Sequence, residues 1–298
     1  MVSLIEVVVI AGLAGAATGI GALPVIVTDR ISHRFYDAAL GLAAGIMFGA
    51  AVFALVVPGL EFGSLWEVVL GVLLGAVFLL VANRLVPHVH LLIEGEADQT
   101  YPRSAPAEET VDASDISLGA NSIGADTDAG DANAADSADS ADNTDDSDEN
   151  RRQALLIGSA ITIHNVPEGL AIGIAFAGGL EGVGIALAIA IAIQNVPDGF
   201  AMAVPASRTG LSNAKTILYT TLSGAVPEPI AAALGFALVA VVTGIFPLAA
   251  GFAAGTMIAV IFREMIPASH GHGYADAATL TFVVGFAIMV VVDVGLAV

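Results

Sequence analysis

Long apolar segments recur along most of the chain and dominate its pattern. The hydrocarbon core of a bilayer is about 30 Å thick, so a helix that crosses it needs roughly 20 mostly apolar residues. The polar and apolar alternation that is typical of membrane β-strands is absent from these segments. The pattern predicts an all-α, polytopic membrane protein with eight transmembrane helices, at 4–27, 38–58, 66–86, 153–178, 183–205, 216–240, 247–267 and 277–297.

Composition supports a membrane protein and narrows the chemistry. Of 298 residues, 56% are apolar and 13% are charged, and the mean hydropathy is +0.85. A soluble domain needs more charge to cover its surface. The chain has no cysteine, which excludes disulfides, thiolate metal ligands and thiol catalysis. The first apolar segment has no basic region before it, so we expect a retained span and not a signal peptide.

Most of the negative charge lies in one segment, 94–150. It holds 17 of the 29 acidic residues but one of the nine basic ones, and it is rich in Asp, Ala, Ser and Asn. Such a segment cannot bury enough apolar surface to fold, so we expect a disordered acidic loop. A low-affinity role in collecting cations is the alternative to a plain linker. The chain then divides into spans 1–3 (1–93), the loop (94–150) and spans 4–8 (151–298), in a 3+2+3 arrangement of helices.

The basic residues predict the orientation of the spans. With eight spans, all nine basic residues fall on one side of the membrane: Arg30, Arg34, Arg84, Arg103, Arg151, Arg152, Arg208, Lys215 and Arg263. Because short cytoplasmic loops are enriched in Lys and Arg, that side is the cytoplasm. We therefore expect both termini to be extracellular, in a protein of the plasma membrane.

Spans 4 and 5 contain a near-repeat, HNVPEG at 164–169 and QNVPDG at 194–199. The first and fifth positions of each motif are four residues apart and so lie on one helical face. Each proline removes a backbone donor and frees the carbonyl four residues earlier, which can then bind a polar side chain, water or a cation. Another carboxylate, Glu228, lies in span 6 between Pro227 and Pro229.

Ionisable side chains inside a bilayer are costly unless they face a partner, a cavity or an ion. Hydrogen bonding between helices is the simpler explanation for a single intramembrane Asn or His. Here one His, one Gln, two Asn and three carboxylates occupy the middle of three consecutive spans. Close carboxylates repel unless they are protonated or joined by a cation. Imidazole, carboxylate and amide oxygen together favour Zn²⁺, Fe²⁺, Mn²⁺ or Cd²⁺ over Mg²⁺ or Ca²⁺.

At these residues the sequence resembles the ZIP (Zrt/Irt-like) family of divalent metal transporters, and its GufA-like branch in particular. The similarity covers all eight spans and the long loop after span 3. It implies a binuclear centre, with two adjoining sites for the transported ions. One site would use Met47, His164, Glu168, Gln194 and Asp198, and the other Asn165, Asn195 and Glu228, with Glu168 and Asp198 bridging.

This sequence departs from the family pattern at two motif positions. Asp198 stands where many members have Glu, and its shorter side chain puts bridging in question. Asn195 stands where some members have Asp, which makes the second site less negative. For Met47 the plain alternative is apolar packing, so its role as a ligand depends on the resemblance alone.

A cytoplasmic exit path is also implied by the resemblance. Glu264 matches a family position that lines the exit, whereas Arg263 replaces a residue that binds metal in some relatives. An interfacial salt bridge between Arg263 and Glu264 is the alternative. Two His-x-His pairs at helix ends could bind the departing metal transiently, or they are solvated loop residues: His88 with His90, and His270 with His272.

These features predict a carrier for zinc, which is not an enzyme and binds no nucleic acid. The resemblance implies a homodimer and an elevator-like movement of spans 1, 4, 5 and 6 against spans 2, 3, 7 and 8. We expect Gly169, Gly173, Gly199 and Gly224 to ease this sliding. A channel that uses the same residues as a selectivity constriction is the alternative. Hydrolysis by a metal-bound water is disfavoured because the motifs supply ligands but no separate base.

Overall fold

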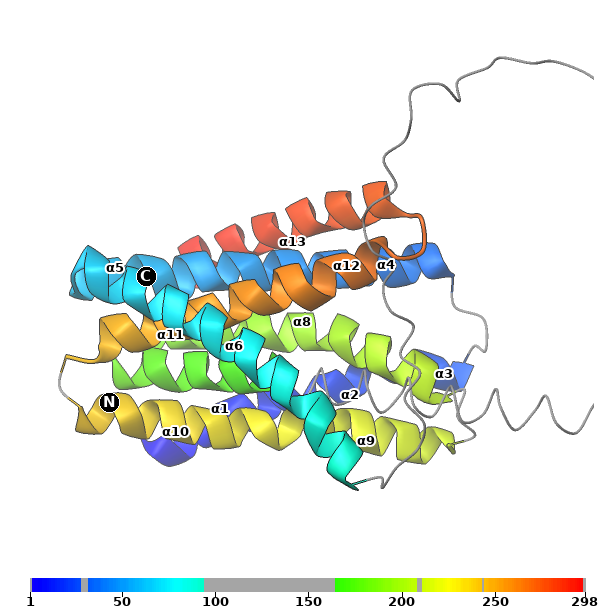
Figure 1. Ribbon diagram of the computed structural model, residues 1–298, viewed down its shortest axis with the longest axis horizontal. Coiled ribbons are helices and arrows are strands. Elements are labelled where there is room, and N and C mark those ends of the chain that lie inside the picture. The colour runs from blue at the N-terminus through cyan, green and yellow to red at the C-terminus, as the bar shows by residue number, and fades with distance from the viewer. Residues whose placement is uncertain (1, 28–31, 94–163, 208–210, 243, 297–298) are drawn as a thin grey trace, which may run out of the picture.

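The computed structural model describes residues 2–27, 32–93, 164–207, 211–242 and 244–296, without the side chains of 25, 85–93 and 205. All its regular elements are helices, and they form one bundle (Figure 1). The start of α1 and the end of α13 lie at the same end of the bundle. Arg151 and Arg152, with all of the acidic loop 94–150, lie outside the described residues. The predicted all-α polytopic fold is confirmed.

Seven helical stretches in the described residues are long and apolar enough to cross a membrane. The predicted fourth span is described only from 164, where residues 164–177 are helical. Several spans consist of consecutive shorter helices. The elements are α1 (Leu4–Ala16), α2 (Thr18–Gly21), α3 (Pro24–Val27), α4 (His33–Gly49), η1 (Ala50–Val56), α5 (Val57–Phe62), α6 (Leu65–Ile93), α8 (Glu181–Ser207), α9 (Asn213–Ala225), α10 (Pro227–Val241), α11 (Phe246–Val260), η2 (Ile261–Met265), α12 (Ile266–His270) and α13 (Ala275–Leu296).

Prolines and capping residues explain many of these boundaries. The Ser3 hydroxyl accepts a bond from the Glu6 backbone N–H at the start of α1, and the Ser3 backbone N–H donates to the Glu6 carboxylate, so that two donors left free at the helix start are satisfied. Spans 2 and 7 each contain a π-helical segment, η1 and η2, shortly before Pro58 and Pro267. A proline cannot donate to the carbonyl four residues earlier, and the wider π-turn is one way in which a helix adapts locally.

Close glycine contacts group the helices into two units, which we call the α8 unit (spans 1, 4, 5 and 6) and the α4 unit (spans 2, 3, 7 and 8). In the α8 unit, a Cβ on Gly15, Gly169, Gly173 or Gly199 would strike backbone atoms of Gly224, Glu228, Ala232 or Thr18, all in spans 1, 4, 5 and 6. In the α4 unit, glycines of α4 and of α13 lie against the other of these two helices, and glycines of α6 and α11 likewise lie against the backbone of each other's helix. Small residues let helices in a membrane approach closely. The backbones therefore touch within each unit.

Contacts between the two units are of another kind. Helix α8 packs against α4, η1 and α13, and α10 touches α11. The buried residues of α4 and η1 are largely small, including Ala43, Ala44, Ala50, Ala51 and Ala54. Two aromatic side chains also meet across this boundary, since Phe35 of α4 contacts Phe200 of α8 with ring centroids 5.3 Å apart. We expected Gly169, Gly173, Gly199 and Gly224 to ease sliding, but their closest contacts lie inside the α8 unit.

Candidate metal site

The polar residues of the near-repeat meet Glu228 in the interior of the α8 unit. Residues 164–168 begin the described part of span 4, and 194–198 lie in the second half of α8. Glu228 is the second residue of α10, directly after Pro227. Gly169 lies against the backbone of Glu228, so the close contact of these two helices brings their carboxylates together. Fully buried in this group are Glu168, Gln194, Asn195 and Glu228.

Two amide side chains hold two of the carboxylates. Gln194 Nε2 donates to Glu168 Oε1 over 2.6 Å, and Asn195 Nδ2 donates to Glu228 Oε1 over 2.7 Å. Asn195 Nδ2 also donates to the backbone oxygen of Ala14, over 2.9 Å. Hydrogen bonds to an ionised acceptor are stronger than neutral ones. The amides of span 5 therefore orient the acids of spans 4 and 6.

The three carboxylates lie close enough to repel one another. Glu168 interacts unfavourably with both Glu228 and Asp198, and Glu228 with Asp198. The imidazole of His164 interacts favourably with Asp198. Uncompensated charge of this kind is expensive in a low-dielectric interior. The arrangement is therefore suited to a positively charged ligand.

Several buried oxygens in this group have no hydrogen-bond partner. Among the described residues, eight buried side-chain atoms lack one, and five of these eight belong to the predicted ligands. All five are potential metal-binding atoms: Asn165 Oδ1, Glu168 Oε2, Gln194 Oε1, Asn195 Oδ1 and Glu228 Oε2. Buried polar atoms are nearly always paired in folded proteins, so a cluster of unpaired acceptors calls for an explanation.

Proline shapes the backbone beside these oxygens. Pro227 cannot donate to the carbonyl of Ser223, four residues earlier in span 6. That carbonyl instead accepts a 2.7 Å hydrogen bond from Asn165 Nδ2. The bond leaves Asn165 Oδ1 directed elsewhere and unpaired. A proline in one span thus orients an amide oxygen of another.

His164 is not directed solely at the near-repeat. Its Nε2 forms a hydrogen bond and ion pair with Glu264 Oε2 in η2. The other oxygen of Glu264 accepts a 2.5 Å bond from Asn83 Nδ2 of α6. The imidazole of the α8 unit therefore bridges to a carboxylate of the α4 unit. Arg263 is exposed, and the described contacts of Glu264 are with His164 and Asn83, not an ion pair with Arg263.

The remaining predicted exit residues are dispersed. His270 is exposed, and its Nδ1 lies 2.9 Å from the carbonyl oxygen of Ile266. His272 Nδ1 lies 2.8 Å from Oδ1 of the buried Asp37, and its ring stacks on that of His33. His88 and His90 lie at the end of α6, where side chains are outside the described part of the structure.

The predicted ligands in the described part of the chain do not form a complete coordination shell. Met47 is buried in the apolar core, so its role as a ligand stays a prediction. Within the described ranges, no three His, Asp or Glu side chains are already arranged to hold one ion. The amides of Gln194 and Asn195 occupy one oxygen each of Glu168 and Glu228, and His164 contacts Glu264.

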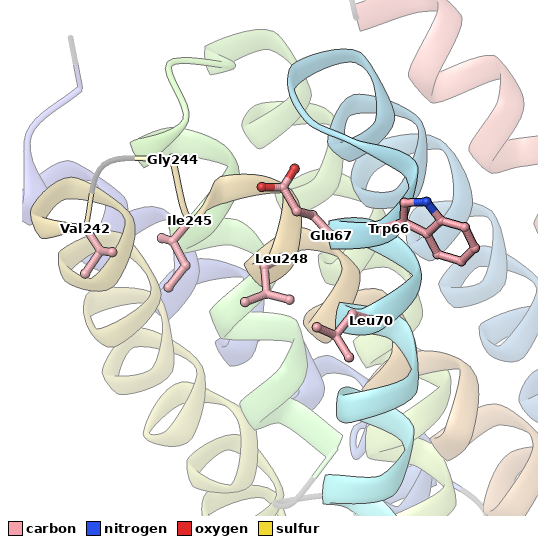
Figure 2. A pocket seen from close by; sticks show the side chains of 7 residues that line it. All are labelled: Trp66, Glu67, Leu70, Val242, Gly244, Ile245 and Leu248. Atoms are coloured by element: carbon pink, nitrogen blue, oxygen red, sulfur yellow. The ribbon is translucent and has the colours of Figure 1, made fainter.

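An apolar crevice opens elsewhere, at the end of the bundle where α6 begins (Figure 2). Its volume is about 400 Å³, and Glu67 is its one acidic lining residue. Glu67 Oε2 accepts bonds from the backbone and hydroxyl of Ser64, so it caps α6. The crevice contains none of the predicted ligands. Its lining is Trp66, Glu67, Leu70, Val242, Gly244, Ile245 and Leu248.

Comparison with known proteins decides the family. The model of the ZIP zinc transporter family matches residues 3–293 of the chain. The chain belongs to the ZIP family. Its relatives include the zinc transporter GufA of Myxococcus xanthus, which is 31% identical over 95% of this chain and 96% of the relative. Human zinc transporter ZIP11 is 32% identical over 94% of each chain, and zinc transporter ZIPB of Bordetella bronchiseptica is 32% identical over 97% of this chain and 81% of its own.

ZIP membership confirms several predictions made from the sequence. The family and these relatives are transporters and not enzymes, and this chain is a multi-pass protein of the lipid bilayer. The resemblance to GufA-like proteins is confirmed as well. The family match identifies no ligand in this chain, so the residues of the site stay predictions.

Two residues that were not predicted from the sequence, Asn83 and Asp37, contact predicted exit residues, Glu264 and His272 respectively. In the sequence, Asn83 is a single amide residue within the apolar segment LLVANR, which does not distinguish it from an ordinary polar residue near the end of a helix. Asp37 lies in α4 four residues after His33, which is the spacing of one helical face, and its side chain is fully buried. Neither position has a motif that would single it out.

Proposed function

We propose that this ZIP protein carries Zn²⁺ across the membrane through the buried group formed by spans 4, 5 and 6. The observation that supports this most directly is the set of five unpaired oxygens on predicted ligands. A divalent cation would accept those oxygens as ligands and would cancel the repulsion between three carboxylates. The zinc-transporting relatives support zinc as the ion. Fe²⁺, Mn²⁺ and Cd²⁺ use the same donor types.

The donors divide into two adjoining sites in this proposal. His164, Glu168, Gln194 and Asp198 form the first, with Met47 as a further ligand from the α4 unit. Asn165, Asn195 and Glu228 form the second, where two neutral amides accompany one carboxylate. Glu168 and Asp198 lie between the sites and would bridge them. The imidazole in the first site favours zinc there more strongly than in the second.

Alternating access follows from the division into two units. The backbones within each unit touch through glycine, so each unit is suited to move as a body. Helices α4 and η1, which pack against α8, bury mostly small residues, and small side chains do not interdigitate deeply. All the predicted ligands except Met47 belong to the α8 unit. Movement of that unit against the α4 unit would carry the ion from one side of the membrane to the other, as in carriers with midplane sites.

His164 gives this movement a direction for release. His164 contacts Glu264 of the α4 unit, whereas Glu168 and Glu228 are bound by the amides of Gln194 and Asn195 in their own unit. The distribution of basic residues supports a cytoplasmic position for the Glu264 end of the bundle. We therefore infer inward transport in a plasma membrane, with both termini extracellular. The homodimer is a further part of this proposal.

Zinc uptake into proteoliposomes tests the proposal. Purified wild-type protein is compared with Glu168→Gln, His164→Ala and, as a matched control, Glu61→Gln, whose side chain is exposed. We expect initial rates in the first two variants to fall by roughly tenfold or more, because each loses a ligand, and the control to match wild type. Undiminished uptake in both ligand variants would overturn the site. Rates that saturate with zinc indicate a carrier, whereas rates that follow the gradient without saturation indicate a channel.

A further inference from the structure

The two oxygens of Glu264 have different partners, and the partners belong to different units. Oε1 accepts from Asn83 Nδ2 of α6, over 2.5 Å, and Oε2 contacts His164 of span 4. Asn83 and Glu264 both lie in the α4 unit, which is packed through the glycines of α6 and α11. When the α8 unit moves, His164 leaves and Asn83 stays. Asn83 is therefore the fixed partner of this carboxylate.

The chemistry of an amide makes this contact specific. A side-chain N–H that donates to Oε1 occupies a lone pair that a metal would otherwise use. A carboxylate with one oxygen engaged in this way binds a cation mainly through the other oxygen. Bidentate binding is thereby disfavoured, and the amide adds no negative charge of its own. Such a carboxylate can receive an ion and also release it.

We propose that Asn83 is a positioning residue for metal release, which holds Glu264 as a one-oxygen acceptor for the ion that leaves His164. This inference rests on the proposed transport function. Asn83 does not bind the ion itself. Its amide orients Oε2 of Glu264 toward the α8 unit and limits how tightly this carboxylate retains a divalent cation.

The substitutions at position 83 give distinct predictions. Asn83→Asp removes the donor and places a second carboxylate beside Glu264, so the two carboxylates together should retain zinc. Asn83→Leu removes the donor without adding charge, so Glu264 loses its orientation. Asn83→Gln keeps an amide and tests whether a donor of similar reach suffices. Asn213→Asp is a matched control, because it makes the same change in charge on an exposed residue at the start of α9.

The experiment measures zinc uptake by each variant over a range of concentrations, and zinc retained by the purified protein after desalting. We expect Asn83→Asp to lower the maximal rate by about threefold or more, lower KM and retain more zinc, as tighter product binding requires. Asn83→Leu should lower the maximal rate without lowering KM. Asn83→Gln should stay within about twofold of wild type, since the donor is kept, and Asn213→Asp should match wild type.

Two outcomes would overturn the inference. One is wild-type KM, maximal rate and zinc retention in Asn83→Asp; the other is equal loss in Asn83→Gln and Asn83→Leu, which indicates a structural role only. Glu168→Gln in the same preparation separates this from the proposed function. If Glu168→Gln is impaired while Asn83→Asp is unchanged, the release role fails alone. If Glu168→Gln transports normally, the transport site itself is wrong. If Asn83→Leu does not fold, the Asn83→Asp and Asn83→Gln variants still test the inference.

Discussion

The side-chain amide of Asn165 donates to the backbone carbonyl of Ser223 over 2.7 Å. The carbonyl is free because Pro227, four residues later, has no N–H to offer. The bond joins span 4 to span 6 in the middle of the bundle, and it orients an oxygen that we assign to the second metal site. A helix break and a ligand are thus parts of one local arrangement.

Asn165→Ala should destabilise the protein by about 1–3 kcal/mol, since it strands a buried carbonyl. Pro227→Ala supplies the missing N–H, so the carbonyl no longer needs Asn165. We expect the double variant to be more stable than the sum of the single effects predicts, as a double-mutant cycle would show. Thermal unfolding in detergent measures the four proteins. Strict additivity would contradict the link between Pro227 and Asn165.

Glu228→Gln should raise the stability of the metal-free protein while abolishing much of its response to zinc. Neutralising one of three mutually repelling carboxylates relieves strain that the site otherwise holds. In wild type, zinc at 100 times its Kd should stabilise the fold by about 2.7 kcal/mol. Unfolding is measured with and without zinc, and Glu61→Gln is the control for removal of an exposed charge. A zinc response of wild-type size in Glu228→Gln would count against this ligand.

Gly169→Ala should impair both folding yield and transport. A Cβ at Gly169 would lie 2.8 Å from the Cα of Glu228, and backbone cannot move aside as a flexible side chain can. Gly12→Ala is the matched control, because a Cβ there meets only Pro229 at an ordinary 3.9 Å. Monodispersity and zinc uptake are measured for both. If the two alanine variants behave alike, close backbone contact is not what holds the α8 unit together.

Linking the two units should stop transport, whereas linking helices within one unit should not. The chain has no cysteine, so pairs can be introduced into the natural sequence. Phe35→Cys with Phe200→Cys joins α4 to α8 across the boundary, and Phe48→Cys with Phe282→Cys joins α4 to α13 inside the α4 unit.

A short thiol-reactive cross-linker is applied to both pairs before uptake is measured. We expect cross-linking to abolish uptake in the Phe35 and Phe200 pair and to leave it largely intact in the other. The reduced, unlinked variants control for the substitutions themselves. Continued transport by the linked Phe35 and Phe200 pair would exclude movement of one unit against the other at this place.

The sequence predicted the helical fold and the meeting of the polar motifs for clear physical reasons. Apolar length identifies spans, and the four-residue spacing of His164 and Glu168 sets a shared face. We expected Glu228 to lie beside His164 and Glu168 because an isolated charge in a membrane is costly. The family match supports transport, but no comparison tests the individual ligands.

Other features depend on packing and could not be derived from the pattern. The bond from Asn83 to Glu264 joins residues far apart in sequence, and an isolated amide near a helix end does not disclose its partner. We expected the glycines of span 4 to ease sliding. Small residues suit tight contact equally well, so the sequence does not distinguish the two roles. Only the helix arrangement shows which glycine faces which backbone, and it places these contacts inside one unit.

The π-helical segment η2 has a consequence for the side of span 7 that Glu264 faces. A π-turn accommodates roughly one residue more than an α-turn, and each residue rotates a helix by about 100°. Removing one residue, such as Phe262, would restore α-helical winding and turn the segment beyond it by a similar angle. The carboxylate would then point away from His164, although no ligand had been substituted. Chain length within a single turn is thus as decisive for the contact between Glu264 and His164 as the identity of the acid.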